Sequence, residues 1–286
     1  MNAYEAQLRA IAGAVEIVSA ERARVRSALG ERSEVAIANE RGAFLGLAEA
    51  LYAGHYSALS YAAPVPGVAP DAFFAELRAA NPIGTRYQGG AYLAPRETVS
   101  SPFGHYVILG RTIHDASSGR QVRFYWSLAP QGAATFLREI GTRLERRRIP
   151  FQAKVPARPD GYGRTDAGVL YLGDEDVAAA SDAIAATYRA VRANLRAPVP
   201  LFARELAPGL SFAESPPTRD SFGMHRCDLI AEGLVWAFER NAANDEARFG
   251  VLCERLTKYG FDLDSFERNP SSRYPYPLDA IVAEAA

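Results

Sequence analysis

Lysine is rare in this chain, and one of its two lysines is placed where it could act as a base. The sequence holds thirty arginines but only Lys154 and Lys258. Arginine stays protonated in proteins, whereas a desolvated lysine can lose its proton and accept another. Lys258 comes near the end of a helical pattern, where a solvated charge is the simpler explanation. Lys154 lies in the apolar, extended stretch 151–156, so we interpret it as a candidate catalytic base.

Arginines on two predicted strands supply donors that could bind a phosphate group. Tyr162, Arg164 and Asp166 alternate at the start of one strand, which would place all three on one face. Pairing of that strand with the strand of Lys154 would bring them beside the lysine. Arg123 lies on an earlier strand and could bind an anion there. The simpler explanations are a solvated face for Arg123 and an ion pair of Asp166 with Arg164 or Lys154.

The start of a predicted helix offers a third group of donors. Ser221 is typical of a helix N-cap, and the free backbone N–H groups and dipole of a helix N-terminus favour an anion. His225 and Arg226 follow in the first turns and could add an imidazole and a guanidinium fork. A buried ion pair of an arginine with Asp228 is the alternative. Taken together, the lysine, arginines and histidines indicate a site that handles phosphate.

Several common kinds of catalytic site have no counterpart in the sequence. It contains no GxxxxGK[ST], no GxGxxG after a strand, no HExxH and no GxSxG. The four histidines and two cysteines show no metal-ligand spacing. We therefore expect no metal and no cofactor, and we disfavour hydrolysis by a metal or by a serine triad.

Composition narrows the setting of the protein. The formal net charge of −1 argues against a nucleic-acid partner. Cys227 and Cys253 fall on apolar helical positions, which indicates buried free thiols in a reducing compartment. The sequence shows neither a signal-peptide pattern nor an apolar run long enough to span a bilayer. We expect a cytoplasmic protein without a membrane partner.

The periodicity of apolar residues predicts an α+β fold. Helical spacing predicts helices at 4–29, 44–55, 71–80, 131–148, 174–195, 222–240 and 249–259. Alternation predicts strands at 87–93, 105–113, 121–128, 151–156 and 162–171. The strands at 105–113 and 121–128 are spaced as a β-hairpin with its turn at 115–119, and the tail from residue 269 is expected to be irregular. We expect an N-terminal helical layer, residues 1–84, packed on a mixed or antiparallel sheet with further helices, residues 85–286.

Several stretches resemble the HopA-type effector family. They are Phe151-x-x-Lys154, Tyr162-x-Arg164-x-Asp166-Ala-x-Val-Leu-Tyr171, Pro200-Leu-Phe, and Leu206-Ala-Pro-Gly-Leu-Ser-Phe-Ala-Glu followed by Ser221-Phe-Gly-Met-His-Arg-Cys-Asp-Leu-Ile-Ala-Glu-Gly-Leu234. The similarity covers roughly residues 85–240, and the last stretch is its most specific part. Relatives occur as type III secretion effectors and in actinobacterial gene clusters for class V lanthipeptides and thioamitides.

The resemblance implies a reaction and a partner. In the peptide pathways, an aminoglycoside-phosphotransferase-like kinase phosphorylates Ser or Thr in a precursor peptide. The family member is then taken to eliminate phosphate, which leaves dehydroalanine or dehydrobutyrine. By this resemblance the protein is a phosphoserine and phosphothreonine lyase in the biosynthesis of a modified peptide, with the phosphorylated precursor as substrate and the kinase as partner.

A more distant resemblance to the phosphothreonine lyases suggests roles for single residues. Those enzymes take the Cα proton with a lysine and protonate the leaving phosphate with a histidine at a strand start. Lys154 corresponds to the base and His105 to the acid, while His225 is the competing acid. Phe103 stands where those lyases carry a second lysine, which leaves phosphate binding to the arginines.

Two other functions fit the same residues. A phosphopeptide-binding subunit that presents substrate to the kinase needs the arginines but no deprotonated Lys154. A secreted effector that acts on host phosphoproteins would use the same chemistry on another substrate. Such effectors usually carry a Ser-rich leader, and this sequence begins with a helical pattern, so we favour the biosynthetic setting.

Overall fold

The chain forms two compact units. The computed structural model describes residues 3–56, 70–86, 93–100, 104–111, 121–218 and 220–285. The first unit comprises Met1–Ser60, Pro200–Arg204 and Ala213–Arg273, and the second comprises Tyr61–Val199, Glu205–Phe212 and Tyr274–Ala286. The expected division at residue 84 differs from these bounds. The reason is that α6 (Phe222–Glu239) and α7 (Asp245–Lys258) pack with the N-terminal segment, which brings distant stretches into one unit.

A seven-stranded sheet forms the centre of the second unit. Its strand order is β11-β12-β8-β10-β9-β7-β6, and every pair among β6 to β10 whose register is known is antiparallel. The strands are β6 (Glu97–Ser100), β7 (His105–Leu109), β8 (Gln121–Trp126), β9 (Gln152–Pro156), β10 (Gly168–Gly173), β11 (Arg204–Ala207) and β12 (Leu210–Glu214). The predicted hairpin of β7 with β8 is wrong, because β9 and β10 lie between them. Its turn at 115–119 lies outside the described residues, as do residues 87–92 of another predicted strand.

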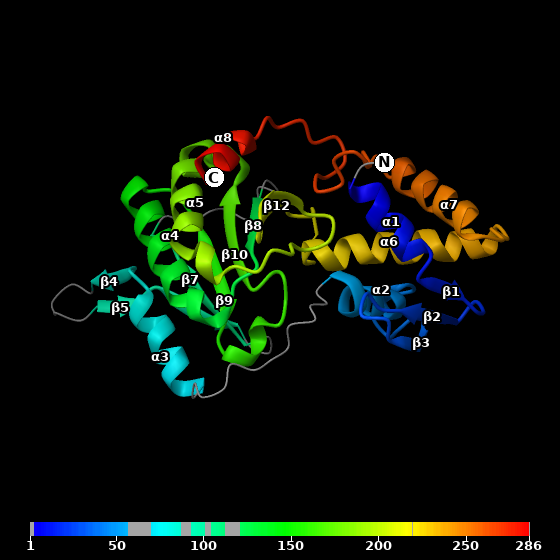
Figure 1. Ribbon diagram of the computed structural model, residues 1–286, viewed down its shortest axis with the longest axis horizontal. Coiled ribbons are helices and arrows are strands. Elements are labelled where there is room, and N and C mark those ends of the chain that lie inside the picture. Colours follow the sequence, from blue (N-terminus) through cyan, green and yellow to red (C-terminus); the bar gives the residue numbers. More distant parts are fainter. Residues whose placement is uncertain are drawn as a thin grey trace. The chain divides into compact units, whose positions relative to one another are not determined.

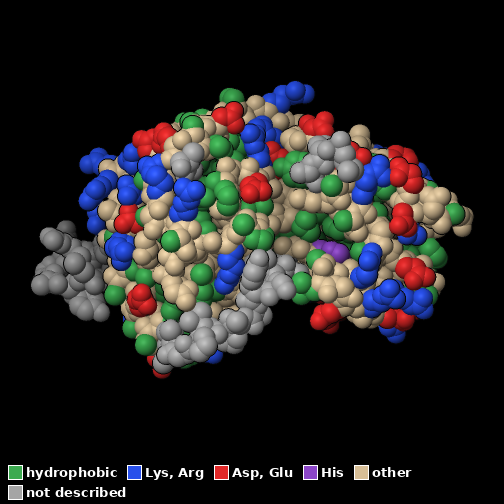
Figure 2. Space-filling view, in the orientation of Figure 1, with side chains coloured by type: hydrophobic (Ala, Val, Ile, Leu, Met, Phe, Trp, Pro, Cys, Tyr) green, Lys and Arg blue, Asp and Glu red, His purple; other side chains and the backbone are tan. Residues whose placement is uncertain are grey.

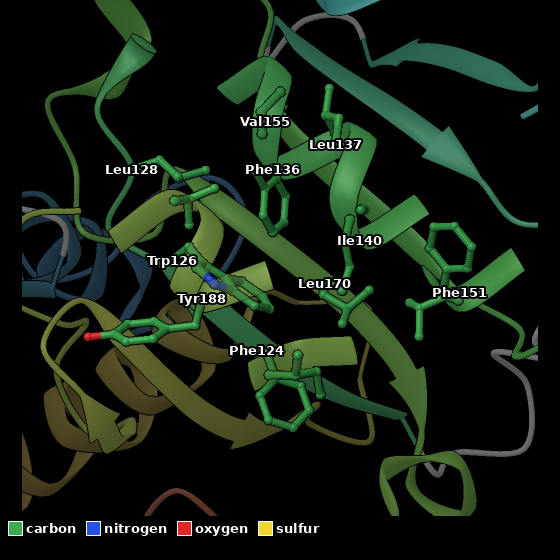
Figure 3. Close-up of a cluster of buried hydrophobic side chains, with 14 of the residues drawn as sticks. Phe124, Trp126, Leu128, Phe136, Leu137, Ile140, Phe151, Val155, Leu170 and Tyr188 are labelled. Atoms are coloured by element: carbon green, nitrogen blue, oxygen red, sulfur yellow. The ribbon is translucent and has the colours of Figure 1, made fainter. Parts of the chain in front are cut away.

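Helices cover one face of this sheet. The helices α4 (Ala133–Arg147) and α5 (Val177–Val191) pack side by side there (Figure 1). Alternating residues of β8, among them Val122, Phe124 and Trp126, are fully buried, as predicted. With Phe136 and Ile140 of α4 they form the hydrophobic core (Figure 3). The residues that alternate with these buried side chains therefore lie on the opposite face of the sheet.

The remaining elements of the second unit are short. They are α3 (Pro70–Ala80), α8 (Leu278–Ala285), the pair β4 (Gly84–Arg86) and β5 (Leu93–Pro95), and the 3₁₀-helices η3 (Pro130–Gly132), η4 (Pro159–Tyr162), η5 (Asp174–Asp176) and η6 (Arg192–Asn194). The helix expected at 71–80 is confirmed by α3. The expectation of an irregular tail is wrong from Leu278 onward, because Leu278 and Ile281 bury themselves in the core through α8.

The first unit contains a small sheet that the periodicity did not predict. It comprises α1 (Ala3–Ala12), strands β1 (Val15–Ile17), β2 (Arg22–Arg26) and β3 (Arg32–Ala36), α2 (Leu45–Leu51), the π-helix η1 (Tyr52–Tyr56), α6 and α7. The long helix expected at 4–29 ends at Ala12. In β2, arginines alternate with Ala23 and Val25, which are buried, so a strand satisfies both sets of residues where a helix could not. Cys227 and Cys253 are free thiols, as predicted, but only Cys227 is buried, whereas Cys253 is half-buried.

The fold is α+β, which confirms the predicted class. Arginine and lysine side chains are interspersed with aspartate and glutamate on the visible surface (Figure 2). Among the described residues, none of the helices combines the length and the apolar character needed to cross a membrane.

Candidate functional site

Lys154 lies on an interior strand of the seven-stranded sheet, on the face opposite α4 and α5. In β9 it pairs with Val107 of β7 on one side and with Val169 of β10 on the other. Its neighbours Ala153 and Val155 are fully buried on the helical side, so alternation directs Lys154 to the other face. The side chain is half-buried. The strand and its pairing with the next strand confirm the predicted placement of this lysine.

His105 shares that face with Lys154. It opens β7 and pairs with Pro156, two residues beyond Lys154 on the adjacent strand, so the histidine and the lysine are diagonal neighbours. Diagonal neighbours in an antiparallel pair lie about 7–8 Å apart, within reach of long side chains. Burial, followed by the charges of Lys154 and Arg164, lowers the pKa of His105 to about 4, although Asp166 acts in the opposite direction. The free protein therefore holds a neutral imidazole beside the lysine at pH 7.

Arg164 and Asp166 form an ion pair in the segment that leads into β10. The guanidinium binds both carboxylate oxygens, with 2.8 Å between Nη2 and Oδ2. The backbone from residue 163 to 167 is a turn and not a strand, so the predicted alternation of Tyr162, Arg164 and Asp166 on one strand face is wrong. Pro159 and two glycines favour turns in this segment and outweigh the alternating pattern. The ion pair leaves Arg164 close enough to His105 to influence its pKa.

Tyr162 belongs to the core of the second unit and not to the polar face. Its ring is 1% exposed and packs edge-on against Phe73. Its hydroxyl donates a hydrogen bond to the carbonyl oxygen of Pro156 at 3.0 Å. Burial raises the pKa of Tyr162 well above its usual value, so the hydroxyl stays protonated. These contacts anchor the segment before Arg164 to the end of β9.

Tyr171 connects Arg123 to Lys154 across three strands. It lies on β10 opposite Arg123 of β8, and both belong to the same sheet face as the lysine. The Nζ atom of Lys154 lies 5.6 Å from the centroid of the Tyr171 ring, and Cζ of Arg123 lies 5.3 Å from it. Both distances permit cation–π attraction. Tyr171 was not among the predicted site residues, although its alternation with Val169, the partner of Lys154, indicates that it shares the face of the lysine.

Ser221, His225 and Arg226 lie in the first unit, at the start of α6. The Ser221 hydroxyl accepts a hydrogen bond from the backbone N–H of Met224 at 3.2 Å, which confirms the predicted N-cap. Arg226 is fully buried and donates to the carbonyl oxygens of Phe266 and Arg268. Phenylalanine rings surround its guanidinium, with centroids 4.6–5.2 Å from Cζ for Phe222, Phe261 and Phe266.

His225 is held by its neighbour Arg226. Arginine only donates, so the 2.8 Å contact from Nη1 makes Nδ1 of His225 the acceptor and puts the imidazole proton on Nε2. Burial, followed by the charge of Arg226, lowers the pKa of His225 to about 4, against an opposing effect of Asp220. The described contacts of His225 and Arg226 thus organise the interior of the first unit.

The structure brings together one subset of the predicted site residues. His105, Arg123, Lys154, Arg164 and Asp166 gather on the second unit. Phe103 lies outside the described residues. Among the described residues, no group of three or more His, Cys, Asp or Glu side chains is arranged to hold a metal ion. The assembled groups offer a lysine, an imidazole and two guanidinium groups, which suit binding of an anion and transfer of protons beside it.

Comparison with known proteins identifies the family. The sequence profile of the HopA1 effector protein family matches residues 94–268, well over half of the chain. The solved structure of the effector protein from Pseudomonas syringae pv. tomato strain DC3000 is similar with a TM-score of 0.52 and 23% identity, over 75% of this chain and 86% of that chain. The effector protein from Pseudomonas syringae pv. syringae strain 61 gives 0.52 and 17%, over 75% and 87%. No curated protein matches with significant similarity. This chain belongs to the HopA1 effector protein family.

Proposed function

We propose that the protein is a phosphoserine and phosphothreonine lyase that acts on a phosphorylated precursor peptide. The observation that carries the proposal is the shared sheet face of Lys154 and His105, with Arg164 close enough to lower the pKa of the histidine. A base and an acid on neighbouring strands can act on the two sides of one elimination, while a guanidinium binds the anion that departs. Membership of the family is consistent with this chemistry and gives no substrate.

The reaction breaks two bonds and forms one double bond. Lys154 takes the Cα proton of the phosphorylated residue, and the electron pair forms the Cα=Cβ bond. The Cβ–O bond breaks, and the leaving oxygen takes the proton that the bound phosphate monoanion has shared with His105, so that the imidazole ends the step neutral as it began. The products are dehydroalanine or dehydrobutyrine and inorganic phosphate. Atoms and charges balance without hydrolysis, and the site residues regain their starting state when the lysine returns its proton to solvent.

The low pKa of His105 decides how the leaving group obtains its proton. At pH 7 the imidazole of the free protein is neutral and has no proton to give as an acid. A phosphate ester has a second pKa of about 6, so its monoanion can carry the proton into the site. A bound phosphate raises the pKa of a nearby imidazole because opposite charge favours the protonated form. His105 and the phosphate then share the proton that the leaving oxygen needs.

Arg164 and Arg123 are the proposed phosphate ligands. Asp166 holds Arg164 by two hydrogen bonds and fixes the plane of its guanidinium. Arg123 is 9% exposed and faces Tyr171, whose ring also faces Lys154. A bound phosphate between the two arginines would place the ester carbon on the side of the lysine. The fully buried Arg226 is not part of this phosphate site in our proposal.

Mass spectrometry of a phosphoserine peptide incubated with the protein tests the reaction. Elimination removes phosphate and leaves a dehydrated residue, whereas a phosphatase restores the hydroxyl group. Recovery of the unchanged phosphopeptide with measurable binding would instead support a phosphopeptide-binding subunit that serves the kinase. An aminoglycoside-phosphotransferase-like kinase, supplied with ATP and the unmodified peptide, should generate the substrate in the same reaction. We place this reaction in the cytoplasm.

A second candidate is an effector that acts on phosphoproteins of a host. The observation that favours it is the family itself, together with similarity to two effector structures. The same residues would carry the same elimination. Comparing a folded phosphoprotein with a linear phosphopeptide as substrates separates the two settings, since a biosynthetic enzyme should prefer the linear chain.

A further inference from the structure

The first unit contains a cavity that the proposed elimination does not use. Its volume is about 610 Å³, and it opens on the small sheet of β1, β2 and β3 and on α7. Its lining includes six charged side chains: Glu16, Arg24, Arg26, Arg32, Glu34 and Arg248. Cavities of this size accommodate a small ligand or a few residues of a peptide. The excess of arginine over glutamate selects an anion.

Two of these arginines face each other without a carboxylate between them. Arg26 of β2 pairs directly with Arg32 of β3, and alternation directs both to one face. Like charges directly opposite each other destabilise a sheet. Among the described residues, neither Arg26 nor Arg32 forms an ion pair, and the guanidinium group of Arg26 donates to the carbonyl oxygen of Gly13 at 3.5 Å. An anion between the two guanidinium groups would remove this repulsion.

The neighbouring arginine on the same sheet face, Arg24, already has carboxylate partners. Arg24 pairs across the strands with Glu16 and Glu34 and forms ion pairs with them at 3.4 and 3.7 Å.

Arg248 of α7 binds Asp245, yet its Nε atom is buried and has no hydrogen-bond partner among the described atoms. A buried donor without an acceptor costs free energy that a ligand oxygen could recover. The free donors of the cavity therefore lie at Arg26, Arg32 and Arg248.

The lining favours a carboxylate-bearing peptide over other polyanions. Among the described residues, no aromatic side chain lines the cavity, so this lining lacks the stacking surface by which proteins bind single-stranded nucleic acid. Glu16 and Glu34 would repel a continuous phosphodiester backbone. The described part of the lining also presents no large apolar side chain that could enter a lipid surface. Carboxylates at single positions of a peptide can bind arginine forks while the glutamates accept its N–H or basic groups.

We propose that this cavity binds an acidic segment of the peptide substrate, with one carboxylate between Arg26 and Arg32 and another at Arg248. The identity of the ligand rests on the proposed function, which requires a peptide that is held apart from its reacting residue. The segment would be recognised by its Asp or Glu side chains and not by phosphorylation. The site thus assigns a recognition function to the small sheet of the first unit.

Fluorescence anisotropy with a labelled peptide of alternating Glu and Gly tests the site. We expect saturable binding that weakens as salt is added, and no binding of the same peptide with Gln in place of Glu. The double variant Arg26→Gln/Arg32→Gln should lose about tenfold in affinity per arginine, the cost of one charge-assisted contact. Arg22→Gln is the matched control, because Arg22 lies on the same strand face but outside the cavity. It should bind as the unchanged protein does.

Thermal unfolding separates loss of the site from loss of the fold. Arg32→Gln should keep or raise the Tm of the protein, because it removes a like-charge pair, while it weakens peptide binding. Equal peptide binding by the double variant, or equal binding of the Gln peptide, overturns the proposal. So does a preference for oligo(dT) or for phosphatidylserine vesicles that depends on Arg26 and Arg32.

The failure of this site and the failure of the lyase reaction give different results. Lys154→Arg should bind the acidic peptide normally although it cannot catalyse elimination. If no phosphopeptide is eliminated but binding still depends on Arg26 and Arg32, the cavity remains a peptide site and the lyase proposal fails. If phosphopeptides are eliminated while acidic-peptide binding is unaffected by Arg26→Gln/Arg32→Gln, the lyase proposal stands and the cavity proposal fails.

Discussion

At the scale of residues, the site depends on a difference between lysine and arginine. Both carry a positive charge, but only lysine can give up its proton readily enough to act as a base. Lys154 is held on the interior strand β9, on the sheet face that also carries Arg123 and His105, and Arg164 lies close enough to His105 to lower its pKa. If charge alone were required at this position, arginine would serve equally well, as it does at thirty other positions.

Replacing the central lysine by arginine should therefore abolish elimination. We expect Lys154→Arg to lower kcat for a phosphopeptide by about a hundredfold or more, the usual contribution of a general base. Lys258→Arg is the control, since Lys258 lies at the end of α7 in the first unit, with its Nζ 5.3 Å from the ring of Trp236. Turnover is measured by phosphate release. Retained turnover in Lys154→Arg would rule out this lysine as the base.

The two candidate acids make opposite predictions. His105→Gln should lower kcat strongly, because His105 lies beside Lys154, while His225→Gln should leave kcat largely unchanged and lower stability by about 1–3 kcal/mol through the lost acceptor of Arg226. If the substrate brings the proton as its monoanion, kcat/KM should fall as pH rises above about 6. Steady-state kinetics from pH 5 to 8 with urea unfolding measures both effects. The reverse pattern would assign the acid to His225.

At the scale of elements, α6 shows how a specific motif can serve the fold. Its first turns combine the Ser221 cap with the buried Arg226. Between them, a Cβ on Gly223 would lie 2.4 Å from Cε1 of Tyr56, a ring that is 2% exposed. Glycine is therefore required by the close packing of η1 on α6. The residues that made this stretch recognisable are largely those that hold the first unit together.

Two glycine substitutions in helices of the first unit should have opposite signs. Gly223→Ala gains helix propensity of about 1 kcal/mol, but overpacking against Tyr56 costs about 1–3 kcal/mol, so the free energy of unfolding should fall. Gly250→Ala in α7 meets no atom within 4 Å and should be stabilising by up to about 1 kcal/mol. Urea denaturation of both variants measures the difference. A stable Gly223→Ala protein would show that the Tyr56 ring can move aside.

At the scale of the whole molecule, each unit contains one tryptophan and a half-buried histidine with a pKa of about 4. Trp126 and His105 belong to the second unit, and Trp236 and His225 to the first. Both histidines have a pKa of about 4 in the folded protein, below the usual value near 6.5 in an unfolded chain. The unfolded chain therefore binds more protons than the folded protein between these pH values. The contribution of these two histidines to the free energy of unfolding is fully present above about pH 6.5 and is lost as the pH decreases toward 4.

Tryptophan fluorescence should resolve this acid sensitivity unit by unit. In a Trp236→Phe background, only Trp126 reports, and His105→Gln should flatten the decrease of stability between pH 7 and 5. In a Trp126→Phe background, His225→Gln should do the same for the signal of Trp236. Urea unfolding at each pH gives the free energies. An undiminished pH dependence in both variants would mean that other groups bind the protons.

Local pattern was sufficient for the elements that carry the proposed chemistry. The strand of Lys154, its pairing with the next strand, the buried alternation of β8, and the helices α3, α4 and α6 were all predictable. Each depends on apolar periodicity or on capping within a short stretch, where side chains on one face meet one environment. The α+β class follows from the same periodicities.

The order of the strands in the sheet and the positions of several site residues could not be predicted from local sequence patterns. The sequence neighbours β7 and β8 are separated by β9 and β10, because the best-packed order of buried strands does not depend on proximity along the chain. Alternating Tyr162, Arg164 and Asp166 looked like a strand, but a turn allows Tyr162 to be buried while Arg164 binds Asp166. The sequence by itself determined that a lysine in an apolar stretch was present together with arginines and histidines. Only the tertiary structure decided that His105 shares the face of Lys154 and that Arg226 is enclosed by phenylalanines, because burial and cross-strand register are properties of residues far apart in the chain.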